Sequence, residues 1–190
     1  NSEKSIELAR KCDEINRQRK ELSSGIESEA VALIEADNMK LPSFILMAQN
    51  HWHPGIIGIV ASRIVEKYNR PTALLSGTKD GLFRASARSP KGFILDKALE
   101  KCSDILENYG GHPAAAGFTI KPQNISKLNT RLNELASEWC KLNSTKKLTP
   151  EAYIEIKEIN WDLWKSLNFF EPFGIGNPKP LFWTRRCKIE

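Results

Sequence analysis

The chain has 190 residues, of which 41% are hydrophobic, and this content is enough to bury a core in one large domain or in a domain with appendages. No apolar run is long enough to cross a bilayer and no signal-peptide pattern is present, so we expect a cytoplasmic location without membrane contact. The net charge of +5 is uneven: residues 1–35 carry 6 Lys/Arg and 8 Asp/Glu, and the basic remainder favours a polyanionic partner.

The first predicted element is one long amphipathic helix over residues 5–35, where apolar residues recur at helical spacing. Its other face is densely charged, which a solvated helix surface explains. A connector to another domain would explain why so long a helix leads the chain. Because the helical pattern is already under way near Asn1, we expect the chain to be a piece of a larger protein. Lys40 and Pro42 mark the end of this connector.

A strand, a helix and a second strand follow. Residues 44–49 form a continuous apolar run that is typical of a buried strand, residues 56–68 have the spacing of a helix, and residues 72–75 form another short apolar run. This order and spacing predict a βαβ-like unit, in which the two strands are parallel.

The turn before this helix holds two histidines. Pro54 and Gly55 suit a helix start, where exposed N–H groups and the helix dipole favour an anion. His51 and His53 have the spacing of a His-x-His metal pair, but no carboxylate or further histidine lies nearby in sequence. A contact from His53 to a phosphate and a plain helix-capping turn both remain open.

Residues 82–89 predict a third strand with two different faces. A period of two places Arg84, Ser86 and Arg88 on one face and apolar or small residues on the other. Two guanidiniums that flank a hydroxyl make a reasonable phosphate-binding surface, because arginine offers forked donors. A solvent-facing sheet surface explains the same pattern.

Residues 110–118 are rich in glycine and alanine and contain one ionisable group, His112. Apolar residues recur at helical spacing over residues 94–109 and predict one or two amphipathic helices that end at Gly110 and Gly111. A strand is expected to start at Phe118. Small residues let a ligand or another backbone come close. An anion site and a tight helix–strand connection therefore both fit this run.

The remaining chain predicts an amphipathic helix over residues 125–142, followed by a polar linker. After the linker we expect a short strand at 153–156, a short helix at 160–167 capped by Asn160, a Gly- and Pro-rich elbow at 171–180 and a strand from Leu181. The four cysteines lie far apart and form no Cys-x-x-Cys pair, so we expect reduced thiols rather than a zinc site or disulfides. We predict no metal site within the chain.

Three stretches strongly resemble the DHHA1 domain of the DHH phosphoesterase superfamily: residues 52–63 (WHPGIIGIVASR), 86–89 (SARS) and 110–118 (GGHPAAAGF). Residues 12–19 (CDEINRQR) resemble the connector helix of the RecJ branch, and residues 171–180 (EPFGIGNPKP) resemble the passage into the RecJ oligonucleotide-binding (OB) domain. The resemblance covers nearly the whole chain and implies an α/β fold with a mixed sheet flanked by helices. It implies a connector helix over residues 1–38, a DHHA1 substrate-binding domain over 39–147, and a linker with the start of an OB-like domain over 148–190.

RecJ family members are single-strand-specific 5′→3′ DNA exonucleases that use Mn²⁺ or Mg²⁺. In the family the metal ligands belong to a DHH domain that precedes the connector helix, and no Asp-His-His occurs in this sequence. The resemblance therefore implies that this piece carries no catalytic metals and is inactive by itself. The implied partners are single-stranded DNA and the protein's own DHH domain, with a helicase or a single-strand-binding protein left open.

Carried over by position, the resemblance assigns phosphate contacts to Ser86 and Arg88 and a catalytic contact with the scissile phosphate, or its neighbour, to His112. Gly110 and Gly111 would allow close approach of the backbone.

Three further phosphate-binding candidates are Arg84, Arg70 and His53. Arg84 follows from the strand face and His53 from the turn described above, and Arg70 is a candidate because a basic residue at the end of that helix resembles the family pattern. Some family members carry another small or basic residue where this chain has Ala85, which affects the phosphate contacts expected there.

Two alternative functions fit the same residues. One is a related DHH phosphodiesterase that acts on oligoribonucleotides or cyclic dinucleotides, although such proteins usually end soon after the histidine motif, whereas this chain continues. The other is a non-catalytic single-strand-binding adaptor whose DHH domain has lost its metal ligands. The sequence before Asn1 would decide between the adaptor and the exonuclease.

Overall fold

A computed structural model describes residues 2–36, 41–143, 149–174 and 176–185 of the chain. The chain divides into two compact units, residues 1–145 and 146–190, and each is described by itself. The predicted domain boundaries near residues 38 and 147, and the boundary residue Lys40, lie outside the described residues. The three-part division of the chain therefore stays a prediction.

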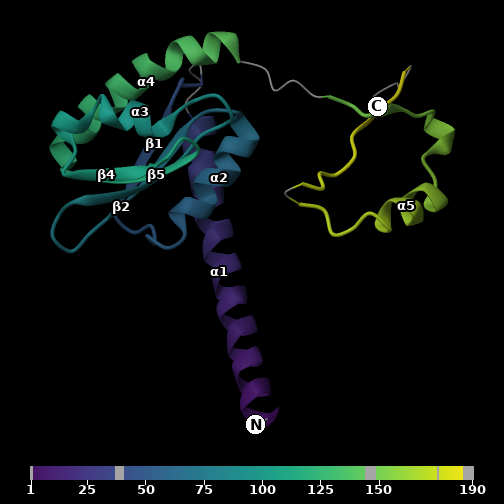
Figure 1. Cartoon of the computed structure of the whole chain (residues 1–190). Helices are drawn as coiled ribbons and strands as arrows, with labels where there is room; N and C mark the ends of the chain where they lie inside the picture. The colour runs from purple at the N-terminus through teal and green to yellow at the C-terminus, as the bar shows by residue number, and fades with distance from the viewer. Residues whose placement is uncertain (1, 37–40, 144–148, 175, 186–190) are drawn as a thin grey trace. The chain divides into compact units, whose positions relative to one another are not determined.

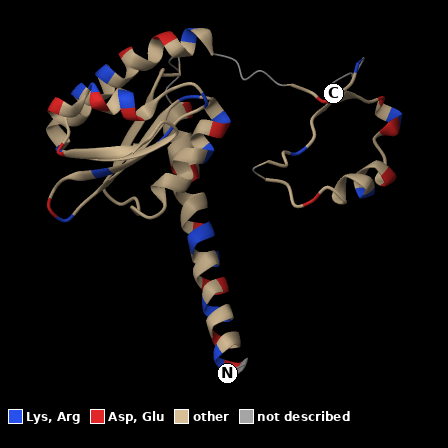
Figure 2. Ribbon diagram, in the orientation of Figure 1, with Lys and Arg blue, Asp and Glu red and all other residues tan. Residues whose placement is uncertain are grey.

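The first unit begins with α1 (Ser2–Ala36), which confirms the predicted long helix. Its N-terminal part projects away from the rest of the unit (Figure 1), and basic and acidic residues are interspersed along it (Figure 2). Only its C-terminal part contributes buried apolar side chains, Ile26 and Ala30. None of the described helices combines the length and the hydrophobicity that a membrane span needs.

The sheet of the first unit is mixed, as predicted, with strand order β1-β2-β3-β5-β4. β1 and β2 are parallel and connected through α2 (Ile57–Tyr68), which confirms the βαβ-like unit, and all other strand pairs are antiparallel. The strands are β1 (Ile45–Gln49), β2 (Thr72–Gly77), β3 (Phe83–Arg88), β4 (Asn108–His112) and β5 (Ala115–Ile120).

Helices cover the two faces of this sheet differently (Figure 1). On one face α3 (Leu95–Glu100) and α4 (Ile125–Leu142) bury a core with residues from all strands except β4. On the other face α2 and the end of α1 pack over β1 and β2. Among the described residues, this second core takes no residue from β3, β5 or β4. The N-terminal turn of α2 still packs against β3 at Ser86 and Arg88, whereas β4 is exposed.

The prediction for residues 94–109 is wrong in its second half. α3 ends at Glu100, a 3₁₀ turn covers Ser103–Ile105, and Asn108–His112 forms the edge strand β4, so Gly110 and Gly111 lie within a strand and do not end a helix. The apolar stripe did mark burial, because Leu99 and Cys102 are fully buried. Antiparallel pairing with β5, which begins at Ala115 and not at Phe118, overrides the weak strand preference of the two glycines.

The second unit contains α5 (Trp161–Asn168) and the short parallel strands β6 (Ala152–Tyr153) and β7 (Phe182–Trp183). The predicted cap of α5 is confirmed: the Asn160 side chain accepts hydrogen bonds from the N–H groups of Asp162 and Leu163, both at 3.0 Å. The predicted strand at 153–156 is shorter than expected, because Ile156 already belongs to a 3₁₀ helix (Ile156–Glu158). The described part of the 171–180 elbow contains no helix.

Candidate functional site

The predicted two-sidedness of β3 is confirmed. Ala85 and Ala87 are 4% and 0% exposed and belong to the core under α3 and α4. On the other side of the strand Arg84 is exposed, and Ser86 and Arg88 are half-buried. The three polar side chains therefore share the face of β3 that lies opposite the core under α3 and α4.

The strand register extends this face across β5 to β4. Directly paired residues of antiparallel strands place their side chains on the same face. Three rows follow from the pairing: Arg84 with Thr119 and Asn108, Ser86 with Gly117 and Gly110, and Arg88 with Ala115 and His112. We call these nine residues the Ser86 face.

The middle row of the Ser86 face is nearly flat, because two of its three residues are glycines. A Cβ atom added at Gly110 would meet no heavy atom within 4 Å, and one added at Gly117 would lie 3.3 Å from the carbonyl oxygen of Ala85. A ligand can therefore approach the backbone of two strands here. Arg88 and His112 stand at the two ends of one bordering row, with only Ala115 between them.

Gly111 has different surroundings from Gly110. Its φ of +151° is strained for other residues, and a Cβ atom there would lie 2.5 Å from both Ala115 O and Ala116 Cα. Its close approach is therefore to the neighbouring strand, and not to the open side of Gly110. The prediction that Gly110 and Gly111 allow close approach of a ligand stays a prediction; the two glycines line a common pocket of about 260 Å³ with Tyr109 and residues of α3.

The first turn of α2 packs against the Ser86 face. A Cβ atom added at Gly58 would lie 3.1 Å from Arg88 Nη2 and 3.5 Å from Ser86 Oγ. Arg88 Nη1 also donates a hydrogen bond of 2.8 Å to the carbonyl oxygen of Ala87, so the guanidinium is held on two sides. Sequence reasoning missed Gly58, although a glycine inside an apolar helical run is a signal of close packing. The positive end of the helix dipole lies beside Ser86 and Arg88.

The ionisable groups of the Ser86 face are two guanidiniums and one imidazole. In the described part of the chain, the ion pairs include neither Arg84, Arg88 nor His112. Arg84 acts at longer range on Asp80: the pKa of this carboxyl is lowered mainly by a hydrogen bond with Thr78, and in smaller part by the Arg84 charge. The face therefore presents positive charge to solvent.

Two predicted site residues lie elsewhere. His53 Nδ1 accepts a hydrogen bond of 3.1 Å from Gly55 N, and the ring lines a pocket of about 650 Å³ that it shares with α1. Arg70 follows the C-terminal end of α2. This helix has 12 residues and is therefore about 18 Å long, so Arg70 lies about one helix length away from the turn that holds Gly58. Its Nη1 donates to the carbonyl oxygen of Asn69 at 3.1 Å. For both residues a phosphate contact stays a prediction.

The two histidines of the His-x-His spacing have different partners. His51 Nε2 lies 3.0 Å from a carboxylate oxygen of Glu29, and His53 contacts the backbone of its own turn. Within the described ranges, no three His, Cys, Asp or Glu side chains come together as metal ligands would.

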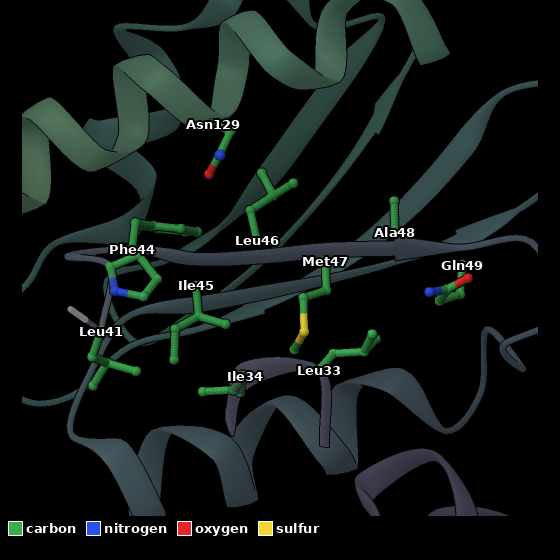
Figure 3. Close-up of a pocket in the computed structure, with 11 residues that line it drawn as sticks. Leu33, Ile34, Leu41, Phe44, Ile45, Leu46, Met47, Ala48, Gln49 and Asn129 are labelled. Carbon is green, nitrogen blue, oxygen red and sulfur yellow. The ribbon is translucent and has the colours of Figure 1, made fainter. Parts of the chain in front are cut away.

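A second pocket, of about 430 Å³, lies along the outer edge of β1. Leu46 and Ala48 point toward α4, and Ile45 and Met47 point to the opposite side of the strand (Figure 3). None of the described residues that line this pocket is charged. It lies at the opposite edge of the sheet from β4, so it is separate from the Ser86 face.

Comparison with known proteins gives two family matches. Residues 41–138 match the DHHA1 domain family, and residues 151–190 match the RecJ OB domain family. Similar curated proteins include the single-stranded-DNA-specific exonuclease RecJ of Bacillus subtilis, 35% identical over 97% of this chain and 24% of the relative. The RecJ of Escherichia coli is 30% identical over 92% of this chain and 32% of the relative. The chain thus spans about a quarter to a third of the length of the relatives that it matches.

Solved structures with a similar fold include RecJ proteins. Thermus thermophilus RecJ in complex with Mg²⁺ superposes with a TM-score of 0.70 at 26% identity, over 90% of this chain and 26% of that one. An exonuclease RecJ bound to manganese gives a TM-score of 0.57 at 28% identity, over 66% of this chain and 30% of that one.

Proposed function

Because the chain belongs to the DHHA1 family in its RecJ form, we propose that it is the part of a single-stranded-DNA-specific exonuclease that binds the DNA backbone. The observation that carries this proposal is the Ser86 face. It combines a flat row, Ser86 with Gly117 and Gly110, with cationic side chains along its borders. A backbone that carries one negative charge per nucleotide is the ligand that such a surface fits.

Each side chain has a distinct role in this proposal. The forked guanidinium of Arg88 donates hydrogen bonds to the oxygens of a phosphate that lies on the flat row. The hydroxyl of Ser86, which belongs to this row, donates to the same phosphate. His112 reaches across Ala115 toward the same phosphate or its neighbour. Arg84 borders the row from the other side and contacts the next phosphate. Contacts of this kind carry no base preference, which suits an enzyme that removes nucleotides of any sequence.

We propose that the parent protein uses Mg²⁺ or Mn²⁺, because its solved relatives were determined with these ions. When bound, such ions activate the attacking water and stabilise the leaving oxygen. The described residues of this chain form no ligand set for them, so we assign the metal ligands to the DHH domain of the parent. By itself the chain is then expected to bind single-stranded DNA without hydrolysing it.

The relatives and the C-terminal match favour this function over an oligoribonucleotide or cyclic-dinucleotide phosphodiesterase. The similarity to RecJ exonucleases extends over 92–97% of the chain in the two relatives described above, and it continues through the RecJ OB match at residues 151–190.

The proposal can be tested in the full-length parent with a 5′-labelled single strand and Mn²⁺. Loss of a charge-assisted hydrogen bond costs about 1.5–3 kcal/mol, so we expect Arg88→Ala to lower kcat/KM roughly 10- to 100-fold. His112→Ala should also lower it. Arg131→Ala is the matched control, because Arg131 lies on α4 over the opposite face and pairs with Asp104. Wild-type activity in both site variants would overturn the assignment.

A further inference from the structure

Glu29 of α1 makes two polar contacts with the loop between β1 and α2. One of its carboxylate oxygens accepts a hydrogen bond of 2.9 Å from Trp52 Nε1 and lies 3.0 Å from His51 Nε2. Trp52 is only 2% exposed and packs in the core that joins α1 to α2, beside residues such as Ile26. Sequence reasoning gave no role to Glu29, and it lies outside the Ser86 face.

The same loop determines where the first turn of α2 lies. The carbonyl oxygen of His53, the residue after Trp52, accepts hydrogen bonds from Ile56 N at 2.9 Å and Ile57 N at 3.2 Å. The next residue is Gly58, which packs against Arg88 and Ser86 so closely that an added Cβ would lie 3.1 Å from the guanidinium. A short, continuous path therefore leads from Glu29 to the two phosphate-binding candidates.

We propose that Glu29 is a positioning residue: it fastens the Trp52 loop to the connector helix α1 and thereby holds Gly58, Ser86 and Arg88 in place for a phosphate. This inference rests on the proposed function of the Ser86 face. It means that the direction of the connector helix and the geometry of the phosphate site are linked, because a displacement of α1 moves the loop and the first turn of α2 with it.

A carboxylate suits this task, because it can serve two neighbouring donors at once. The bond from Trp52, and next the one with His51, lower the pKa of Glu29, which keeps the carboxylate charged at neutral pH. Trp52 and His51 contact the same carboxylate oxygen, so an amide whose oxygen takes that place keeps an acceptor for both but loses the negative charge. Glu29→Gln should therefore retain part of the function that Glu29→Ala loses.

The helix pair offers a closely matched control. Glu35 of α1 also accepts two hydrogen bonds, from Lys67 Nζ and Tyr68 Oη, both at 2.9 Å. These donors lie at the C-terminal end of α2, away from the loop and from Gly58. Glu29→Ala and Glu35→Ala thus each remove two polar contacts between α1 and the body of the unit, but only the first removes contacts with the loop.

The test uses the 190-residue chain, with fluorescence anisotropy of a labelled oligothymidylate for affinity and thermal unfolding for stability. We expect Glu29→Ala to raise the Kd about fivefold or more, since small misplacements of binding groups have large effects. Glu29→Gln should give an intermediate Kd. Glu35→Ala should stay within about twofold of wild type at a similar loss of Tm.

The outcomes separate this inference from the proposed function. If the wild-type chain does not bind the single strand, the proposed function fails and the inference fails with it. If the wild type binds and Glu29→Ala binds equally well, or Glu35→Ala weakens binding as much, only the positioning role of Glu29 is overturned. If Glu29→Ala does not fold, Glu29→Gln against Glu35→Gln decides: a raised Kd in the first alone supports the role, and equal Kd values overturn it.

Discussion

Two adjacent glycines of β4 allow the fold and the binding surface to be tested separately. Gly111→Ala places a methyl group 2.5 Å from two backbone positions of β5, Ala115 O and Ala116 Cα, which cannot rotate away. Strained backbone costs about 1–3 kcal/mol and an overpacked contact about the same again. We therefore expect this variant to lose roughly 2–6 kcal/mol of unfolding free energy in a urea titration.

Gly110→Ala should behave in the opposite way. Its methyl group meets nothing within 4 Å, so the unfolding free energy should change by no more than about 0.5–1 kcal/mol, in either direction. The same methyl group stands on the flat row of the Ser86 face. If the DNA backbone must move aside by one methyl group at a cost of about 1–2 kcal/mol, the Kd for a labelled single strand rises about 5- to 30-fold.

The two measurements together can refute this geometry. A Gly110→Ala variant as unstable as Gly111→Ala would show that the open side of β4 is misassigned. A stable Gly110→Ala variant with unchanged affinity would show that DNA does not lie on the flat row.

Two further predictions concern stability. The pKa of Asp104 is lowered chiefly by its hydrogen bond with Arg131. The ionised Asp104 therefore stabilises the fold above the pKa of an unfolded aspartate, about 3.9. This stabilisation is lost as the pH falls through the lower pKa that Asp104 has in the folded state. The Tm advantage of wild type over Asp104→Asn should therefore shrink below about pH 4, and a constant difference from pH 7 to pH 3 would contradict this. Leu132→Ala opens a cavity at a fully buried position and should cost about 2–5 kcal/mol of unfolding free energy, whereas Leu142→Ala, at a position 81% exposed on the same helix, should cost less than about 0.5 kcal/mol. Equal urea midpoints for these two variants would contradict the core assignment.

Elements with strong local signals could be predicted from the sequence. The helix over residues 125–142 has the predicted bounds, because its apolar stripe is regular and a polar stretch follows it. The period of two in β3 correctly separated Arg84, Ser86 and Arg88 from the core. In both cases the decisive pattern lies within a few neighbouring residues.

β4 could not be predicted in this way. Its five residues are all exposed, two are glycines, and its strand conformation comes from pairing with β5. The same dependence on tertiary structure applies to the site. The sequence singled out Ser86, Arg88 and His112, but β5 lies between β3 and β4, so only the strand register shows that Arg88 and His112 border one flat row.

Gly58 and Glu29 join the site through contacts that are distant in sequence. Gly58 meets a strand nearly 30 residues later, and Glu29 meets Trp52 across 23 positions. A glycine within an apolar helical run was the one local signal, and a glutamate on a charged helix gave none.

The salt dependence of single-strand binding is the most direct test of the Ser86 face as a phosphate site. For single strands, each phosphate contact contributes about −0.7 to the slope of log affinity against log salt concentration. We expect the wild-type chain to bind a labelled oligothymidylate with a clearly negative slope. Arg88→Ala should weaken binding and make the slope less steep by about 0.7, and Arg131→Ala should change neither. Salt-independent binding by the wild type, or an Arg88→Ala variant with unchanged affinity and slope, would contradict a phosphate site on this face.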